Sequence, residues 1–301
     1  MLICDTHADT LYTRCTAPAG TAFDISAGML TEHPEETRLQ VLALYVCTGG
    51  MEERPTIVQR ELAMLEVLKK EGFRQVTKVD DALPGQANCM LSIEGCEAFG
   101  GRPEEIGRFA ALGVRLAALM WNNENGIGHP AVSGSKEGLT PFGREVVRLL
   151  RENRIAVDIS HLNERGAEEV LDADVPPLAS HSCAYRLCAH PRNLTDAQLK
   201  ALFRAGGFVG VNFYPSFLRP SGTAEADTVI DHMAYMCDLG GEDCVGLGSD
   251  FDGIETHPAG LRTAADVPAL LRRMEKRGFG GKLIEKIAGE NFRRYMRLID
   301  A

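Results

Sequence analysis

The chain has 301 residues, of which 45% are hydrophobic, and its formal net charge is −10. A chain of this length can bury a large core, as one domain or as two smaller ones. The negative charge argues against nucleic acid, whose phosphates need a basic face, and weakly against anionic membranes. We find no signal peptide and no run near the roughly 20 apolar residues of a spanning helix. We therefore expect neither a nucleic-acid nor a membrane partner.

The nine cysteines are scattered singly along the chain, without a CxxC pair. Their number is odd, and several lie in apolar runs, where cysteine behaves as a small hydrophobic residue. Reduced thiols of this kind are typical of cytoplasmic proteins, so we expect a cytoplasmic location.

Short apolar runs alternate with amphipathic segments along the chain. Most of the runs are nearly continuous, which is typical of parallel strands covered on both faces. The runs predict strands at Leu2–Asp5, Val41–Val46, Met90–Ile93, Val114–Met120, Ile155–Ile159, Pro177–Ser180, Phe208–Asn212 and Cys244–Gly248. The amphipathic segments predict helices at Thr56–Glu71, Pro103–Leu112, Pro141–Asn153, Glu164–Leu171, Thr195–Ala205 and Ala226–Leu239, and two more after the last strand at Ala264–Arg277 and Lys282–Ala288.

This alternation predicts an α/β fold, a (β/α)₈ TIM barrel with extra C-terminal helices. Without a repeat or a low-complexity linker, we expect residues 1–301 to form a single catalytic domain. A doubly wound open sheet is the alternative, but it would gather ligands at one switch point. Here polar residues follow many different strands, and a closed ring explains that spread better.

Five residues of metal-ligand type lie at or just beyond predicted strand ends. They are His7, Asp9, Glu94, His161 and His181. In a (β/α)₈ barrel this end of the strands carries the active site, and imidazole and carboxylate groups are ligands of Zn²⁺. Singly, each has a plainer reading: a hydrogen-bonded His–Asp pair, a helix-capping glutamate, or a core histidine. Together they indicate two Zn²⁺ ions that share a carboxylate.

The segment after the last strand reads Gly-Ser-Asp-Phe-Asp-Gly, and Asp250 emerges first. We expect Asp250 to face the pore as a proton shuttle, with an N-cap or a loop acid as the alternative; Asp252 and Gly253 are typical of a turn. Asp158 either orients a metal-binding imidazole or is a buried structural acid. The other five histidines lie in polar or proline-rich stretches and are expected at the surface or in loops.

The pattern resembles the membrane (renal) dipeptidase family, zinc-dependent dipeptidases of the amidohydrolase-like barrels. The motifs DTHADT, SIEG, VDISHL, ASHSCAY, HPRNLTD, GGFVGVNFYP and VGLGSDFDG carry the likeness in order over almost the whole chain. The resemblance implies a first zinc on His7, Asp9 and Glu94 and a second on Glu94, His161 and His181, with Glu94 bridging. It also implies a homodimer.

The resemblance assigns three further residues. Arg192 matches the arginine that binds the free carboxylate of the substrate, Asp250 the acid/base aspartate, and Tyr214 a tyrosine near the substrate. One position departs from the family, because Trp121 stands where animal members carry a histidine thought to hold the scissile carbonyl. Tryptophan offers an N–H donor but cannot titrate, so Trp121 with Asn122 or Asn125 is expected to contact the substrate instead.

These residues predict a zinc-dependent dipeptidase that cleaves short peptides, including those with a C-terminal D-residue, through a metal-bridging hydroxide activated at neutral pH. The net positive pocket and Arg192 favour a substrate that ends in a carboxylate. One alternative is a related binuclear-metal amidohydrolase that acts on another small amide or a lactone, which Trp121 keeps open. Another is a barrel that binds metal or peptide without turnover, although the full ligand set argues against it.

Overall fold

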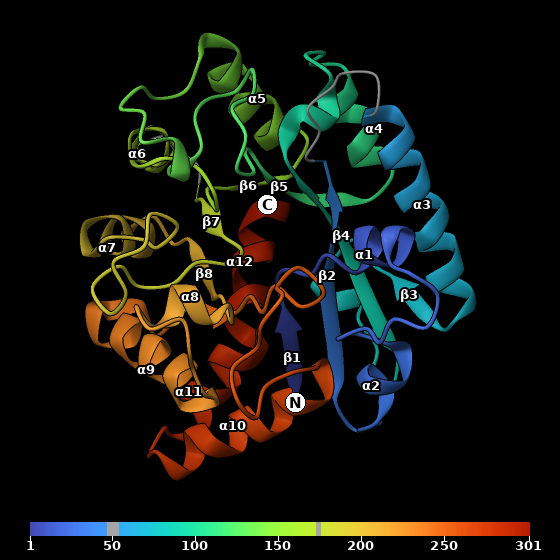
Figure 1. The fold of residues 1–301 in the computed structure, drawn as a ribbon, viewed down its shortest axis with the longest axis vertical. Coiled ribbons are helices and arrows are strands. Elements are labelled where there is room, and N and C mark those ends of the chain that lie inside the picture. The colour runs from blue at the N-terminus through green and yellow to red at the C-terminus, as the bar shows by residue number, and fades with distance from the viewer. Residues whose placement is uncertain (47–53, 173–175) are drawn as a thin grey trace.

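The computed structural model describes residues 1–46, 54–172 and 176–301. Eight parallel strands close into a barrel in the order β1-β2-β4-β5-β6-β7-β8-β9, with β9 returning to β1 (Figure 1), which confirms the predicted fold. The barrel strands are β1 (Leu2–Asp5), β2 (Thr37–Tyr45), β4 (Ala87–Glu94), β5 (Val114–Ala118), β6 (Ala156–Asp158), β7 (Leu178–Ala179), β8 (Phe208–Val211) and β9 (Val245–Leu247).

Helices surround the barrel, and most of those predicted from the sequence are present. They are α3 (Arg54–Lys70), α4 (Glu105–Ala111), α5 (Pro141–Glu152), α6 (Glu164–Leu171), α7 (Asp196–Arg204), α9 (Ala226–Met236) and α10 (Val267–Lys276). The capping residues act as their types predict: the side chains of Thr140, Asn163 and Thr195 accept the first free N–H groups of α5, α6 and α7. Local capping chemistry therefore sets where these helices begin.

The sequence pattern does not predict several short elements. Strand β3 (Phe73–Gln75) pairs with the first residues of β4, on the edge that β5 joins from Leu91 onward. Helices α1 (Thr10–Thr16), α2 (Ala27–Thr31) and α8 (Pro215–Leu218) lie in loops. The predicted helix Lys282–Ala288 is instead α11 (Gly281–Glu285) followed by a π-helical turn and α12 (Asn291–Asp300). Elements of three to seven residues are too short to show a full hydrophobic period.

The expected surface or loop position is wrong for His232. This side chain is fully buried on α9, where its Nδ1 accepts the Ala184 N–H and its Nε2 donates to the Leu218 carbonyl. A neutral imidazole with both nitrogens satisfied can replace an apolar residue in a core.

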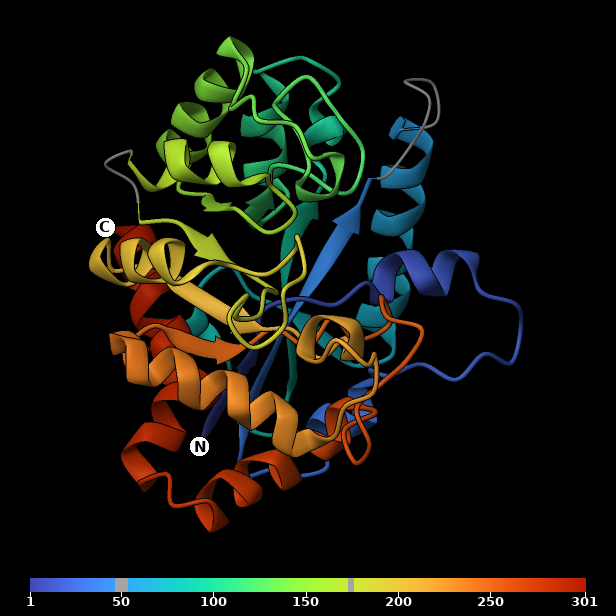
Figure 2. The same ribbon diagram turned by 60° about the vertical axis from the view of Figure 1, so that its left-hand side comes forward.

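The barrel strands all end on one rim, and many of their buried side chains pack against the surrounding helices. In Figure 2 the arrows of β2 (blue) and β4 (teal) point to the same end of the barrel. Buried Leu42, Leu44, Leu91 and Ile93 belong to one large hydrophobic cluster with the inner faces of the helices. The last residues of the strands and the loops beyond them are therefore held by a rigid core.

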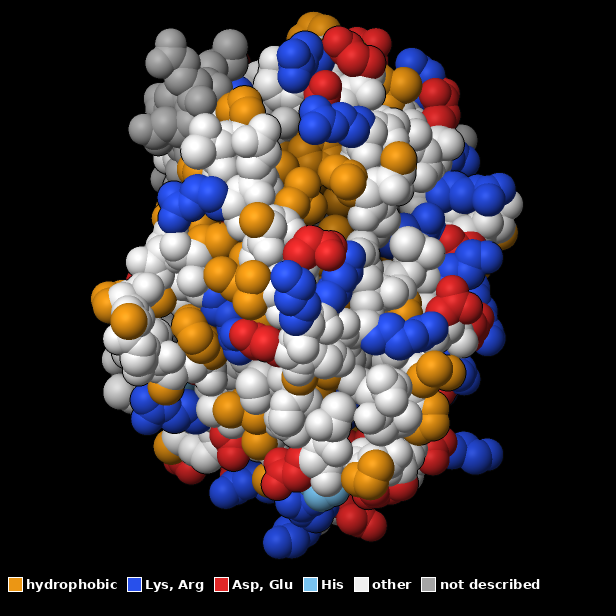
Figure 3. Space-filling model, turned by 90° about the vertical axis from the view of Figure 1, so that its right-hand side faces the viewer, with side chains coloured by type: hydrophobic (Ala, Val, Ile, Leu, Met, Phe, Trp, Pro, Cys, Tyr) orange, Lys and Arg blue, Asp and Glu red, His pale blue; other side chains and the backbone are white. Residues whose placement is uncertain are grey.

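The outer helical layer carries a mixed surface. Figure 3 shows charged side chains of both signs around a hollow floored by hydrophobic ones. A groove of about 280 Å³ lies between α3 and α4, with Val58, Leu62, Phe109 and Leu112 among its lining residues. Across the described ranges, no helix combines the length and the apolar character that a membrane crossing requires.

The eight cysteines within the described ranges are unpaired, as expected from their scattered positions. The ninth, Cys47, lies outside the described residues.

Candidate metal centre

The structure brings the predicted metal ligands together at the C-terminal rim of the barrel. His7 follows β1, Glu94 is the last residue of β4, and His161 and His181 follow β6 and β7. All four are buried, with exposed fractions between 1% for His181 and 6% for His161. Because parallel strands end on the same side, residues from distant parts of the chain meet within one small volume.

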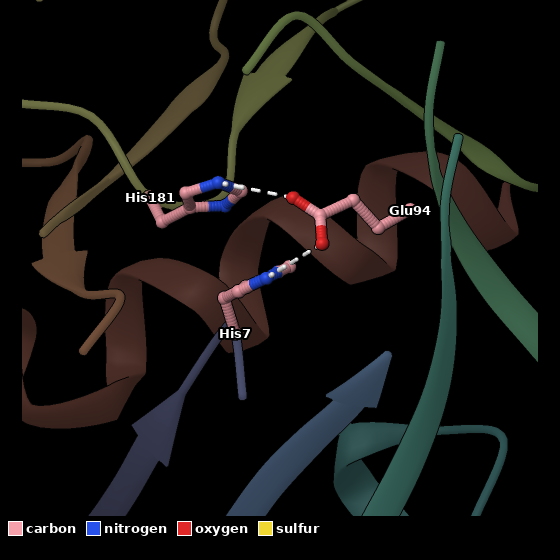
Figure 4. Close-up of side chains that lie close together, drawn as sticks. All are labelled: His7, Glu94 and His181. Atoms are coloured by element: carbon pink, nitrogen blue, oxygen red, sulfur yellow. Dashed lines mark ion pairs between the residues drawn. The ribbon is translucent and has the colours of Figure 1, made fainter. Parts of the chain in front are cut away.

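Glu94 lies between the histidines, as Figure 4 shows for His7 and His181. Its Oε1 atom is 2.9 Å from Nε2 of His161 and 3.5 Å from Nε2 of His181. Its Oε2 atom is 3.6 Å from Nε2 of His7, on the other side of the carboxylate. The two oxygens of Glu94 therefore face two different sets of ligands.

Asp9 and Asp250 extend the cluster on the His7 side. Nε2 of His7 is 3.9 Å from Oδ1 of Asp9 and 3.8 Å from Oδ1 of Asp250. Both carboxylates are slightly exposed, at 13% and 14%, so the cluster opens to solvent on this side. Asp250 thus lies close enough to the ligands to exchange a proton with a group bound among them.

The cluster fits a divalent metal ion. In the part of the chain that the structure describes, His7 Nε2, Asp9 Oδ1 and Glu94 Oε2 are buried without a hydrogen-bond partner. The ligand atoms of His7, Glu94 and His181 lie within 4.8 Å of one another, and so do those of His7, Asp9 and Asp250. Buried polar atoms without partners are costly unless a ligand satisfies them, and nitrogen and carboxylate oxygen are donors that Zn²⁺ prefers.

Electrostatics support the same conclusion. Burial lowers the pKa of His7, but Glu94, Asp9 and Asp250 more than compensate and raise it to about 10. Burial raises the pKa of Asp9 well above its usual range, and neighbouring carboxylates add to the effect. Negative charge is therefore crowded on this side of the cluster, and a dication would compensate it.

The imidazoles of His161 and His181 are in the form that binds metals. Burial lowers the pKa of His161 to about 4, and it also lowers the pKa of His181. Both rings are therefore neutral at pH 7, and their Nε2 atoms, the potential ligands, lie 2.9 Å from each other beside Glu94.

Partner side chains fix the orientation of both rings. Oδ1 of Asn122 lies 3.0 Å from Nδ1 of His161, so the amide that we expected near the substrate also holds this imidazole. The Ser180 hydroxyl lies 2.7 Å from Nδ1 of His181 and donates to Asp158. Asp158 thus acts on His181 through Ser180, as an orienting residue behind the ligand. In both histidines Nε2 is left to face Glu94.

The backbone is strained at two of the site residues. His161 and Asp250 have positive φ angles of 67° and 66°, which is unusual for residues other than glycine. Such strain, of order 1–3 kcal/mol each, is found mostly where function requires a particular side-chain direction. Gly253 is needed for space, since a Cβ there would lie 2.2 Å from Oδ2 of Asp9 and 2.6 Å from Oδ1 of Asp250.

Arg192 lies beside the cluster with unused hydrogen-bonding capacity. It is only 4% exposed, and its Nε and Nη2 atoms have no partner among the described residues. Burial lowers the pKa of Arg192 to about 10, against the opposing effect of Asp250 and Glu94, so it is charged at pH 7. Its guanidinium lies 5.5 Å from the ring centre of Phe217, which in turn contacts Tyr214 edge-on at 5.0 Å. Phe217 thus contacts both Arg192 and Tyr214.

Trp121 borders the cluster beside His161. Its ring centre is 6.3 Å from that of His161 and 5.3 Å from that of Tyr45. Asn125, the other residue considered for a substrate contact, uses its side chain within its own loop, donating to Glu97 and Leu119 and accepting from Ile127. Of the two asparagines, Asn122 is the one that contacts a predicted ligand, His161.

Sequence reasoning missed four residues of this region: Ser180, Asn212, Tyr12 and Tyr45. The Asn212 amide donates to Oδ2 of Asp250 at 2.9 Å and holds that carboxylate in place. Ser180 and Asn212 each lie at the end of a strand next to a predicted site residue, and that position was the signal available.

Comparisons with known proteins find relatives that match most or all of the chain. A protein of Klebsiella pneumoniae is 36% identical over 219 residues, covering 69% of this chain and 80% of its own length. An uncharacterised dipeptidase of Schizosaccharomyces pombe is 37% identical over 70% of this chain, which spans about half of that relative (53%). A Rhodobacter sphaeroides metallopeptidase, solved with a phosphinate mimic of L-Ala-D-Ala, has a TM-score of 0.89 at 27% identity, with 99% of both chains covered.

The family comparison covers nearly the whole chain. A sequence model described as membrane dipeptidase (peptidase family M19) matches residues 3–301. The match confirms the predicted enzyme class, a metal-dependent hydrolase of peptide bonds. By the extent of this match and the likeness of its relatives, the chain belongs to the membrane dipeptidase family.

Proposed function

We propose that this member of the dipeptidase family cleaves dipeptides with a free C-terminal carboxylate, including those that end in a D-residue, and that it does so with two Zn²⁺ ions. The observation that carries the proposal is the buried, charged Arg192 guanidinium with two unpartnered nitrogens beside the ligand cluster. The solved relative bound to an L-Ala-D-Ala mimic supports the same substrate class.

Two metal positions are supported by the two faces of Glu94. Its Oε2 side faces His7, with Asp9 beyond, and its Oε1 side faces His161 and His181. We infer that His7 and Asp9 would hold one Zn²⁺ ion and that His161 and His181 would hold the other, with Glu94 shared between them. When bound there, Zn²⁺ acts as a Lewis acid that lowers the pKa of water from 15.7 to about 7 and polarises the substrate carbonyl.

Asp250 is the residue placed to move the proton. Asn212 holds its Oδ2 atom, which leaves Oδ1 directed at the cluster, 3.8 Å from Nε2 of His7. Burial raises the pKa of Asp250, so the carboxylate is a better proton acceptor than one in water. In this proposal Oδ1 accepts the proton of the attacking water and delivers it to the leaving amine.

In this proposal Arg192 binds the C-terminal carboxylate of the substrate. A guanidinium presents parallel N–H donors that match a carboxylate bidentately, which an ammonium group cannot do. A dipeptide carries its carboxylate one residue from the scissile bond, so the anchor at Arg192 sets that bond over the cluster. Longer peptides would place their carboxylate further away, and the enzyme is expected to favour dipeptides.

The test combines metal analysis with hydrolysis of L-Ala-D-Ala, L-Ala-L-Ala and the C-terminal amide of L-Ala-D-Ala. We expect two zinc ions per chain, cleavage that a chelator abolishes, and poor cleavage of the amide. Arg192→Lys should raise KM for L-Ala-D-Ala at least tenfold. The matched control is Arg186→Lys, which changes an exposed arginine of the same loop.

Equal KM values in Arg192→Lys and Arg186→Lys would contradict the role of Arg192. Stoichiometric metal without cleavage of any peptide would point to the alternative amide or lactone substrates.

We also propose that the enzyme works in the cytoplasm as a homodimer. The unpaired cysteines support the first part, because thiols persist in a reducing compartment. Thiol titration of freshly isolated protein and its mass in solution test the two parts separately.

A further inference from the structure

Three aromatic side chains stand in a row on the rim of the barrel. They are Tyr12 on α1, Tyr45 at the end of β2 and Trp121 after β5. Tyr45 contacts both others edge-on, with ring centres 4.7 Å from Tyr12 at 70° and 5.3 Å from Trp121 at 85°. We call these three residues the aromatic wall. All three are only partly buried, although large aromatic rings are usually placed in the core.

The aromatic wall borders the metal ligands along its length. Tyr12 is three residues from Asp9, Tyr45 lies beside Glu94 in the strand register, and the Trp121 ring centre is 6.3 Å from that of His161. A group bound at the cluster therefore has apolar ring surface immediately to one side.

The strand order places Tyr45, the middle residue of the aromatic wall, across the barrel from the loop that carries Arg192. Arg192 lies in the loop after β7, and Tyr45 ends β2. In the closed order β1-β2-β4-β5-β6-β7-β8-β9, strands β2 and β7 are four strands apart in either direction. A dipeptide whose carboxylate is held at Arg192 and whose scissile bond lies at the cluster must extend its N-terminal residue toward the opposite side of the rim.

We propose that the aromatic wall is the subsite for the N-terminal side chain, and that the enzyme prefers dipeptides with a large apolar or aromatic residue at that position. This inference rests on the proposed dipeptidase function and adds a substrate class to it. Edge-to-face contacts hold the rings in fixed positions, so an incoming ring or branched side chain meets preformed apolar surface. Burial of such a side chain corresponds to roughly a ten- to hundredfold gain over alanine.

The experiment compares kcat/KM for L-Phe-D-Ala, L-Ala-D-Ala and L-Ala-D-Phe in the metal-loaded enzyme. We expect at least a tenfold preference for L-Phe-D-Ala over L-Ala-D-Ala. Trp121→Ala and, separately, Tyr12→Ala should bring that ratio close to one without changing the ratio of L-Ala-D-Phe to L-Ala-D-Ala. Trp121→Phe, which keeps a ring but removes the indole N–H, should retain the preference.

The matched control is Tyr235→Ala, which removes a partly exposed aromatic ring on α9 whose hydroxyl donates to Asp196. It should leave all three ratios unchanged. If the aromatic wall has only a structural role, its variants should be less stable. The ratio of kcat/KM for L-Phe-D-Ala to that for L-Ala-D-Ala should then stay the same. An enzyme without preference for L-Phe-D-Ala, or variants that keep that preference, would overturn the proposal.

A binding measurement separates this inference from the proposed function. Trp121 is the only tryptophan of the chain, so intrinsic emission reports directly on the aromatic wall. Phosphinate analogues of L-Phe-D-Ala and L-Ala-D-Ala should both alter the emission, with the Phe analogue binding at least tenfold more tightly. If no dipeptide is cleaved but the two analogues still differ in affinity, the proposed dipeptidase function is wrong and the proposed subsite is supported. Equal affinity of the two analogues overturns the subsite.

Discussion

Strand β4 buries a polar side chain near each end, and the two are satisfied in different ways. At the N-terminal end the Asn88 amide donates to the carbonyls of Arg38 and Leu83, and its oxygen accepts the Leu83 N–H. At the C-terminal end Glu94 Oε2 has no hydrogen-bond partner among the described residues. On this strand Asn88 uses its polar atoms for stability, whereas Glu94 keeps one oxygen available for a ligand.

The difference shows which buried polar residues to expect at a functional site. A satisfied group such as Asn88 fixes the chain, because breaking it would leave buried backbone atoms unpaired. The cluster around Glu94 costs stability until a cation or a substrate binds. Strained backbone at His161 and Asp250 occurs at this same end.

The largest effect is expected from Glu94→Gln. The neutral amide removes the shared negative charge between the two sets of ligands, so metal affinity and activity should both fall below detection. Zinc at a concentration of 1,000 times its Kd should stabilise the folded wild type by about 4 kcal/mol and so raise its melting temperature. Zinc should not change the melting temperature of the variant. Metal analysis and thermal unfolding with and without zinc check this, and a zinc-stabilised variant would contradict the bridging role.

Asp250→Asn should separate proton transfer from metal binding. The amide keeps the shape of the side chain but cannot accept a proton, so turnover should fall by roughly 10²–10⁴. Metal content should equal that of the wild type. If the variant instead loses zinc, Asp250 belongs to the ligand set, as its 3.8 Å distance from His7 Nε2 would then indicate.

Asn88→Ala should affect the other end of the strand alone. Loss of its hydrogen bonds leaves buried backbone groups unsatisfied and should lower the free energy of unfolding by about 1–3 kcal/mol. Zinc content and kcat/KM at 25 °C should be unchanged. Chemical denaturation measures the stability, with Gln86→Ala, an exposed neighbour, as the control. A matching fall in activity would show that the two ends are coupled.

The smallest effect concerns Glu61, a fully buried carboxylate on α3 that accepts the Tyr45 N–H. Burial raises its pKa well above the unfolded value of about 4.3. The folded protein therefore holds this proton more tightly, and its stability falls as pH rises from that value through the raised pKa. Glu61→Gln keeps an acceptor for Tyr45 and removes this titration.

Melting temperatures of wild type and Glu61→Gln should be close at pH 4 and separate by a few degrees in favour of the variant at pH 8. A difference that stays constant across this pH range would mean that Glu61 does not titrate there.

Much of this site was predictable because it lies at strand ends. His7, Glu94, His161 and His181 all follow apolar runs, and parallel strands in a barrel end on one rim. Their convergence did not require knowledge of any side-chain conformation. The residues behind them were less predictable, since serine and asparagine at a strand end are common and only contact reveals that Ser180 orients His181.

The local sequence also determined where three helices begin, through Thr140, Asn163 and Thr195, because capping depends on residues within one turn. Short elements did not follow from it, since the three residues of β3 show no alternation.

The sequence by itself thus determined the barrel, the ligand types and the rim on which they meet, because periodicity and strand-end position are local properties. Only the tertiary structure decided which oxygen of Glu94 faces which histidine, and that Asn212 holds Asp250. It alone assembled the aromatic wall, whose members span residues 12 to 121. These relations depend on distances between strands that are far apart in the chain, and closure of the barrel sets those distances.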